Sequence, residues 1–435
     1  MDALFPAFNR SLKDVKANKI VLALSGGMDS RVLLDLLHRY QNENSVSCLA
    51  VHVHHGLSAN ANHWVQQCQQ WCADAGIELA VEYVELSLKG QSIEECAREA
   101  RYQALAKHLG MGDVLLTGQH SDDQLETFLL ALKRGSGPKG LSAMAKQMPF
   151  QGATLIRPLL DVAREQIEQY AQVKALEWVE DESNQDTRFD RNFIRHQVTP
   201  VLKQRWPHIH SAVQRTSELC AEQEALLEEL LSSTLAVATY DDSSLSIEFL
   251  AQQSERVRTQ LIRMWFAAAG LKMPSREHIA KIWLEVALAR QDANPILNLN
   301  GGQVRRFSER LYWVSSVEDI SRWQSRIQLN QSIDLPDNLG ALKLVNSPQG
   351  KLSLLALQSA PLTIIFDPEG LSAHPLGRGH SRKLKKLFQE YGIPSWLRRR
   401  LPILICGDQV VAIANLFIDV HFSGQDCELI WDKPL

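Results

Sequence analysis

The sequence predicts an α/β protein whose N-terminal half forms a doubly wound, mostly parallel sheet. In that half, short apolar runs alternate with amphipathic helical patterns, which is typical of successive β–α–β units. Further along, the pattern turns helical, and beyond residue 325 short strand candidates are separated by proline and glycine. We therefore expect a helical middle domain and a small α+β C-terminal domain after the sheet.

The order of the elements follows from the periodicity. Ligands of such sheets bind beyond the carboxyl ends of the strands, so the loops that follow the first, second and fourth strands should share one crevice. The expected strands are 20–24, 46–53, 78–84, 113–117 and 153–157, and the expected helices between them are 30–41, 61–76, 92–109 and 122–134.

Later patterns set the expected domain borders. Helical patterns cover 219–231, 249–268 and 278–288, a β-rich piece follows at 295–316, and a basic helical stretch is expected at 380–390. The expected domains are 1–205, 206–315 and 316–435.

The composition is that of an ordinary soluble protein. The chain has 435 residues and a net charge of −4, and no apolar run approaches the ~18 residues of a membrane helix. Seven dispersed cysteines without a Cys-x-x-Cys pair indicate a reducing cytoplasm. Cys68 and Cys72 are expected to be buried thiols, with a metal site as the alternative. Nucleic-acid binding would need a local basic patch.

The most specific motif is the turn at residues 25–30, Ser-Gly-Gly-Met-Asp-Ser. It follows an apolar strand and opens a helix, where backbone N–H groups and a helix N-terminus can hold phosphate. The turn is neither a Walker A loop nor Gly-x-Gly-x-x-Gly. Asp29 would repel phosphates unless a divalent cation bridges them, so it is predicted to bind Mg²⁺. A plain capped turn is the alternative.

A second polar segment, 118–127, follows the expected strand 113–117 and opens a helix. Asp122, Asp123 and Glu126 lie in its first turns, after His120. Acidic residues there also complement the helix dipole, but three carboxylates and a histidine exceed what capping needs. We predict that they bind Mg²⁺, bind a cationic amine or take its proton.

Basic residues gather in three places. Arg98 and Arg101 lie one helical turn apart and could bind phosphate or a carboxylate, or form surface pairs with glutamate. The second place is a basic stripe on one expected helical face, formed by Arg188, Arg191 and Arg195. An ordinary charged face is the alternative.

The third basic segment, 376–400, holds eight Lys or Arg residues against the single acid Glu390. His380, Tyr391 and Trp396 lie among them. This excess fits contact with a nucleic-acid backbone, with the aromatic rings available to stack on unpaired bases. A solvated helix is the alternative.

Taken together, these motifs resemble a known family. The turn at 25–30 resembles the PP-loop of the ATP pyrophosphatases, and nearly the whole chain resembles the bacterial tRNA(Ile)-lysidine synthases. The matching segments, in the order of the family, are 25–30, 52–57, 95–102, 117–127, 134–141, 157–160, 181–195 and 385–388, followed by Pro394, Trp396, Leu397 and 398–402. Ser58, Gln119 and Asn415 depart from the residues the family often has: Arg, His and Gly.

The resemblance implies a Rossmann-like PP-loop domain and a two-step reaction. Such enzymes use ATP and Mg²⁺ to adenylate the C2 oxygen of the wobble cytidine in an isoleucine tRNA with a CAU anticodon. Free L-lysine then displaces AMP. The implied location is cytoplasmic, without a membrane partner, and a homodimer is left open.

The resemblance and the residue chemistry give the predicted site. The predicted catalytic residues are Asp29, Asp123, Glu126 and Arg101, with Arg101 on the carboxylate of lysine. The predicted nucleotide-binding residues are Ser25, Gly26, Gly27, Met28, Asp29, Ser30 and His55, and the predicted Mg²⁺ ligands are Asp29 and Asp122. The predicted tRNA contacts are Arg188, Arg191, Arg195, Arg382, Lys383, Lys385, Lys386 and Arg398.

Other functions are less consistent with the sequence. A PP-loop tRNA thiolase commonly needs a cysteine pair, and no Cys-x-x-Cys occurs. An amidotransferase would need a glutaminase domain before residue 25. A tRNA-binding protein with an inactive nucleotide site is the remaining alternative, and the intact turn at 25–30 argues against it.

Overall fold

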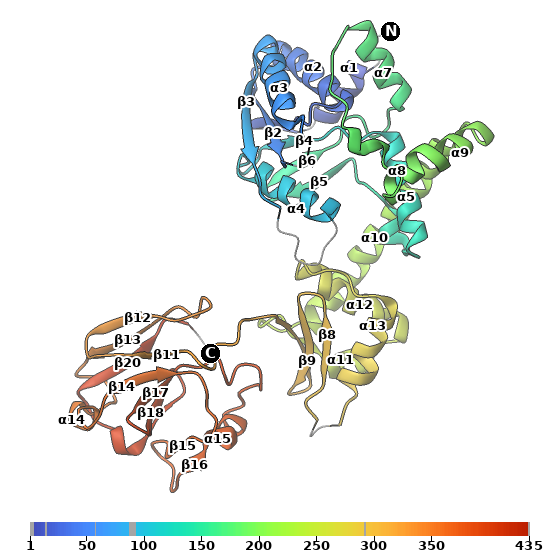
Figure 1. Ribbon diagram of the computed structural model, residues 1–435. Helices are drawn as coiled ribbons and strands as arrows, with labels where there is room; N and C mark the ends of the chain where they lie inside the picture. The colour runs from blue at the N-terminus through green and yellow to red at the C-terminus, as the bar shows by residue number, and fades with distance from the viewer. Residues whose placement is uncertain (1–3, 14, 57, 87–92, 291–292, 434–435) are drawn as a thin grey trace. The chain divides into compact units, whose positions relative to one another are not determined.

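The computed structural model describes residues 4–13, 15–56, 58–86, 93–290 and 293–433 (Figure 1). Leu57 and Ser92, which belong to a matching segment and to an expected helix, lie outside them. By its internal contacts the chain divides into two compact units, Met1–Glu229 and Leu230–Leu435. The division falls inside the long helix α10 (Ile209–Ala238), and the two borders between the three expected domains stay predictions.

A six-stranded sheet with the order β3-β2-β1-β4-β6-β5 organises the first unit. All neighbours are parallel except β5 and β6, and the five predicted strands are confirmed. The antiparallel edge strand β5 was not predicted. The strands are β1 (Lys19–Ala23), β2 (Ser47–His54), β3 (Glu78–Tyr83), β4 (Val114–Leu116), β5 (Gln147–Phe150) and β6 (Ala153–Ile156).

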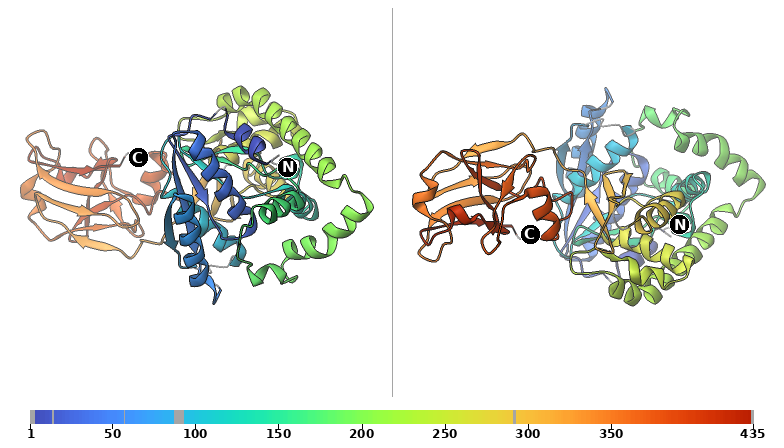
Figure 2. Two further views of the ribbon diagram at one scale, coloured as in Figure 1. Left: turned by 90° about the horizontal axis from the view of Figure 1, so that it is seen from above. Right: turned by 90° about the horizontal axis from the view of Figure 1, so that it is seen from below.

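Helices cover both faces of this sheet (Figures 1 and 2). Successive residues of β1 point to opposite faces: Leu22 joins a core with α1, α2, α3 and α7, whereas Val21 packs with Leu105 of α4. The helices are α1 (Leu4–Leu12), α2 (Met28–Glu43), α3 (Ala61–Ala75), α4 (Ile93–Ala106), α5 (Ser121–Lys133), α6 (Pro138–Leu141) and α7 (Arg164–Val173). The four helices expected between the strands are thus confirmed.

After α7 the chain returns across the unit through short helical pieces. They are η1 (Glu182–Gln185), α8 (Asp190–Phe193), the π-helical η2 (Ile194–Val198) and α9 (Thr199–Arg205). The expectation that Arg188, Arg191 and Arg195 share one helical face is wrong. Arg188 precedes α8, and the Asp186 carboxylate accepts hydrogen bonds from its backbone N–H and guanidinium, a local bond that competes with helix formation.

The second unit begins with the predicted helical part and its β-hairpins. Its core contains Leu261, Phe266 and Ile282, all fully buried, and Gly301, with φ +87°, forms the predicted turn. The four strands pair in the order β7-β10-β9-β8. The elements are β7 (Leu245–Ser246), α11 (Ile247–Ala251), α12 (Glu255–Ala268), α13 (Arg276–Lys281), η3 (Ile282–Ala287), β8 (Ile296–Leu299), β9 (Gly302–Phe307) and β10 (Arg310–Ser315).

The rest of this unit is rich in short antiparallel strands, as expected. Five-, three- and two-stranded sheets surround a core that includes Phe366 and Phe388. The elements are β11 (Gln324–Arg326), β12 (Gln331–Asp334), β13 (Ala341–Asn346), α14 (Leu354–Leu357), β14 (Leu362–Ile365), β15 (Ser372–Ala373), β16 (Arg382–Lys383), α15 (Leu384–Glu390), β17 (Ile403–Cys406), β18 (Gln409–Ile413), β19 (Phe417–Ile418), η4 (Val420–Phe422) and β20 (Cys427–Trp431).

Two local features correct or explain the sequence analysis. The basic helix expected at 380–390 begins only at Leu384, because Arg382 and Lys383 pair with β15 as a strand. Asn415 has φ +59°, a left-handed conformation that asparagine tolerates better than most residues, so Asn can replace the family's glycine. Among the described residues, no helix has the length and apolar character needed to cross a membrane.

Candidate active site

The loop between β1 and α2 is held by its own serines. The N–H of Gly26 donates to Ser30 Oγ (3.1 Å), Ser30 Oγ donates to the carbonyl of Gly27 (2.9 Å), and Ser25 Oγ lies 3.1 Å from Ser30 Oγ. Gly27 caps α2 without a side-chain hydrogen bond. The N-terminus of α2 therefore keeps the donors and partial positive charge that suit an anion.

Glycines allow two loops to pack closely here. Gly26 has φ +90°, and a Cβ there would lie 2.8 Å from the side chain of Val179. A Cβ on Gly118, after β4, would lie 3.3 Å from Asp29 Cβ and from the backbone nitrogen of Ser30. Because β1 and β4 are parallel neighbours, their carboxyl ends bring the predicted nucleotide loop and the polar segment 118–127 together, as expected.

Several buried polar atoms at these strand ends hydrogen-bond to no other atom in the described part of the chain. They come from three loops: Asp29 Oδ1, His55 Nδ1 and Nε2, Thr117 Oγ1 and Gln119 Oε1. Buried polar atoms normally have partners, so this set fits a bound polar ligand. Thr117 and Gln119 were not assigned a role from the sequence; Gln119 was noted only as a departure from the family.

His55 and Arg101 are electrostatic neighbours. Burial, and then the charge of Arg101, lower the pKa of His55 to about 4, so the ring is neutral at neutral pH and can both donate and accept. Arg101 is exposed on α4, and its electrostatic neighbours include Arg191 and Asp181. Arg101 thus links the loop after β2 to the segment after α7. His52 differs, since its Nδ1 lies 2.9 Å from the carbonyl oxygen of Leu24 in the core.

His120 connects Asp29 to the carboxylates of α5. Its Nδ1 accepts from the N–H of Asp122 (3.2 Å), while Asp123 Oδ2 accepts from the N–H of His120 (3.1 Å), which forms a capping box. Because Nδ1 accepts, the ring N–H is on Nε2, which lies 3.5 Å from Asp123 Oδ2 and 3.7 Å from Asp29 Oδ2. Burial raises the pKa of Asp29, so this carboxylate would gain from a nearby cation.

Glu126 is fully buried and already paired. Its Oε1 accepts from Arg195 Nε (2.7 Å), and its Oε2 accepts from Arg191 Nε (2.8 Å) and Arg195 Nη2 (2.9 Å). Asp123 Oδ1 also accepts from Arg195 (3.1 Å). Two of the arginines predicted to contact tRNA thus point inward, onto the two carboxylates predicted to hold lysine.

Asp122 pairs with basic residues of α9 and α10. Its carboxylate lies 3.4 Å from Lys203 Nζ and 3.3 Å from His210 Nε2. Burial opposes its ionisation, but His210 and Lys203 outweigh that effect and hold its pKa well below the ordinary value. Because its partners are cationic, Asp122 fits a structural ion pair between α5 and the helices α9 and α10 better than the predicted role of a Mg²⁺ ligand. Nothing in the local sequence signalled Lys203 or His210.

A bound metal would depend on few protein ligands. Within the described residues, no group of three or more His, Cys, Asp or Glu side chains is placed to hold a metal ion. Cys68 and Cys72 are buried thiols whose pKa values burial raises to about 12, in agreement with the expectation of buried thiols. Mg²⁺ commonly binds through one or two carboxylates plus phosphates and water, which the unpartnered Oδ1 of Asp29 fits.

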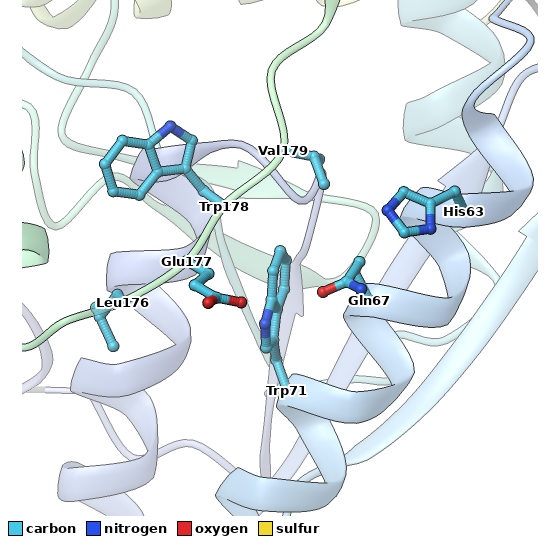
Figure 3. A pocket seen from close by; sticks show the side chains of 7 residues that line it. All are labelled: His63, Gln67, Trp71, Leu176, Glu177, Trp178 and Val179. Carbon is cyan, nitrogen blue, oxygen red and sulfur yellow. The ribbon is translucent and has the colours of Figure 1, made fainter.

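A separate hollow of about 520 Å³ lies beside α3 (Figure 3). None of the predicted site residues lines it. Its walls are His63, Gln67, Trp71, Leu176, Glu177, Trp178 and Val179. Val179 donates its N–H to the carbonyl of Gly26 (3.0 Å). The segment that forms this wall therefore helps to hold the nucleotide loop in place.

The basic segment of the second unit is partly neutralised. Arg378 and Arg382 both pair with Glu390, Arg399 pairs with Glu369, and Arg400 pairs with Asp337. Lys383, Lys385 and Lys386 are exposed.

Other members of this segment are used in packing. Arg398 is half-buried, and its Nε donates to the carbonyl of Ile393 (3.0 Å). The ring of Trp396 packs against Tyr312 and Phe307, with centroids 5.3 and 6.1 Å away, so it is not a free stacking surface.

Comparisons with known proteins agree with this arrangement. Family models match as a PP-loop domain at residues 4–202, a TilS substrate binding domain at 245–312 and a TilS substrate C-terminal domain at 362–432. A PP-loop domain implies the use of ATP. Among solved structures, the U34-tRNA thiolase NcsA from Methanococcus maripaludis aligns over 50% of this chain and 78% of its own, with 19% identity and a TM-score of 0.43, too distant to bear on function.

Full-length relatives are much closer. The tRNA(Ile)-lysidine synthase of Vibrio parahaemolyticus serotype O3:K6 (strain RIMD 2210633) is 58% identical over 438 residues. That of Vibrio vulnificus (strain CMCP6) is 59% identical over 436 residues. Both alignments cover 100% of each chain. The chain therefore belongs to the tRNA(Ile)-lysidine synthase family.

Proposed function

We propose that this protein joins free L-lysine to C2 of the wobble cytidine of an isoleucine tRNA with a CAU anticodon, at the expense of ATP. The observation that carries the proposal is the convergence of an anion-binding loop, unpartnered polar atoms and a carboxylate cluster at one edge of the sheet. Full-length identity to enzymes of that name supports the same reaction. The proposed reaction takes place in the cytoplasm.

In the first step the cytidine C2 oxygen attacks the α-phosphorus of ATP, and the bond to the β-phosphate breaks. Ser25, Ser30 and the N-terminus of α2 bind the departing pyrophosphate, where negative charge develops. Asp29 would hold Mg²⁺, which would neutralise charge on the phosphates. The neutral ring of His55 hydrogen-bonds a nucleotide base, because both of its nitrogens are otherwise unpartnered.

In the second step the ε-amine of lysine attacks C2, and the C2–O bond breaks so that AMP leaves with the electron pair. Asp123 and Glu126 form the amine site, and Arg101 binds the carboxylate of lysine. Because both oxygens of Glu126 accept from arginine, an ammonium that reaches Glu126 must replace a guanidinium hydrogen bond. The carboxylate of Asp123 or Glu126 that lies beside the ε-amine also accepts the proton that this amine loses.

The decisive experiment supplies the purified protein with ATP, Mg²⁺, lysine and bulk bacterial tRNA. Mass analysis of the nucleosides should show a cytidine that has gained lysine and lost water, together with equimolar AMP. A nucleoside that gains sulfur would instead identify a thiolase. The absence of ATP–pyrophosphate exchange in the presence of tRNA would leave only a tRNA-binding protein with an inactive nucleotide site.

A further inference from the structure

Two phenylalanines project from the segment that follows Asp186. Phe189 is 42% exposed and Phe193 is 47% exposed. The N–H of Phe193 donates to the carbonyl of Phe189 (2.9 Å), so the backbones of the two residues lie one helical turn apart. Two large apolar rings exposed this close together suggest a partner that covers them.

The same segment also carries the cations of the candidate site. Arg191 and Arg195 each follow one of the phenylalanines by two residues, a little more than half a helical turn. Their guanidiniums bind Glu126 and Asp123. The same short stretch of backbone, 189–195, therefore carries both the arginines that bind the carboxylate cluster and the two exposed rings.

The surroundings of the rings favour nucleic acid over protein. Charged side chains flank them: Arg188 is 88% exposed, and Lys133 pairs with Asp190 (2.6 Å) at 59% and 62% exposure. Two rings among charges fall far short of the ~800 Å² per partner that a standard protein interface buries. Unpaired RNA bases, by contrast, stack on single aromatic side chains while arginine meets their phosphates.

We propose that Phe189 and Phe193 form a stacking platform for the unpaired nucleotides that flank the target cytidine. The proposal rests on the proposed function, because it takes a tRNA as the substrate. When the target base reaches the carboxylate cluster, its neighbours in the strand would lie within reach of the exposed rings, because residues 191 and 195 of the same segment bind that cluster. The platform supplies the tRNA contact that the inward-facing Arg191 and Arg195 do not offer.

The test compares three replacements at both positions: Phe→Ala, Phe→Leu and Phe→Trp. Binding of tRNA to the full chain is measured by filter retention without ATP, so that the result does not depend on catalysis. Double Ala and double Leu variants should bind roughly five- to a hundred-fold more weakly, whereas double Trp should bind like the wild type. Met111→Ala, an 81% exposed residue near the amino end of β4, should have no effect.

A photoreactive nucleotide on either side of the target cytidine should crosslink to the wild type at residues 189–193, and less to the Ala variant. Wild-type affinity in the double Leu variant would overturn the proposal, because it would mean that apolar area rather than stacking matters. Unchanged binding by the double Ala variant would also overturn it. Wild-type binding and crosslinking without a lysine-containing product would contradict the proposed function while supporting the platform.

Discussion

The carboxylate cluster on α5 and the basic segment 376–400 are both dense in charge, but the fold treats them differently. Glu126 is fully buried, and arginines brought from α8 and η2 satisfy both of its oxygens. In 376–400 four of the five arginines pair with carboxylates, whereas Lys385 and Lys386 stay exposed on α15.

The difference in burial between these two groups of charges determines what each group can do. Buried ion pairs are strongly coupled, and the loss of one member leaves an uncompensated charge. Exposed charges are screened by solvent and salt, so each contributes little to stability and remains available to a charged partner. The α5 cluster therefore suits precise chemistry on a small substrate, and the α15 lysines suit contact with a polyanion.

The largest effect is expected at Asp29, whose carboxylate has no Lys or Arg within ion-pair distance among the described residues. Asp29→Ala should lower ATP-dependent AMP release at least 10²–10³-fold, because the variant loses its electrostatic contact with the phosphates. The free energy of unfolding should stay unchanged or rise slightly, since burial already disfavours this charge. Glu43→Ala, exposed at the other end of α2, is the control. Near-normal AMP release in Asp29→Ala would rule out the metal role.

Breaking the buried pair should cost stability as well as activity. Glu126→Gln should lower the free energy of unfolding in urea by on the order of 2–4 kcal/mol, because Arg191 and Arg195 lose their shared charge partner. The two guanidiniums are about one-quarter exposed, which places the effect toward the lower end of that range. The KM for lysine should rise, while adenylate formation stays measurable.

The matched control for this variant is Glu228→Gln. Glu228 pairs with Lys139, and both side chains are about half exposed, so the change should stay within about 0.5 kcal/mol. If Glu126→Gln keeps both wild-type stability and wild-type lysine kinetics, the contrast between buried and exposed charge fails at this site.

The sequence predicted features that depend on neighbouring residues, but not the contacts between distant segments that bury the charges of the α5 cluster. Apolar periodicity placed the strands and helices of the first unit, and the motif at 25–30 placed the anion-binding loop, because both depend on residues close in sequence. The pairing of Glu126 with Arg191 and Arg195 joins separate segments and was missed. A stripe of arginines looks the same in sequence whether it faces solvent or a buried carboxylate.

Local hydrogen bonds explain the remaining errors. The Asp186 carboxylate accepts from the backbone N–H of Arg188, which lies before the start of α8, and pairing with β15 turns Arg382 and Lys383 into a strand. Local hydrogen bonds compete with helix formation. The pattern of charges in the sequence does not reveal them. The antiparallel edge strand β5 contains Pro149, which argues against a strand from sequence, although an edge tolerates it.

A smaller effect is expected from His55, whose pKa in the folded protein lies near 4, below the ordinary 6.5. Between these two values the unfolded chain binds more protons than the folded one, so stability rises with pH across this window and levels off above 6.5. The span should be on the order of 1–3 kcal/mol. His55→Gln should flatten this part of the pH profile relative to wild type, and His63→Gln, exposed on α3, should not. An unchanged profile in His55→Gln would show that the ring is protonated as easily in the fold as outside it.

The smallest effects belong to the exposed lysines. Replacing Lys383, Lys385 or Lys386 by Gln, one at a time, should weaken tRNA binding a few-fold and reduce the log–log salt slope by roughly 0.7 to 0.9 for each phosphate that the variant no longer neutralises. ATP affinity should not change, since these lysines lie outside the nucleotide-binding unit. Arg382→Gln is the informative comparison: Arg382 shares Glu390 with Arg378, so its charge is already partly used and the slope should change less. If Arg382→Gln reduces the slope as much as Lys385→Gln does, then a surface ion pair does not withhold a cation from RNA, and exposure alone decides which of these cations bind.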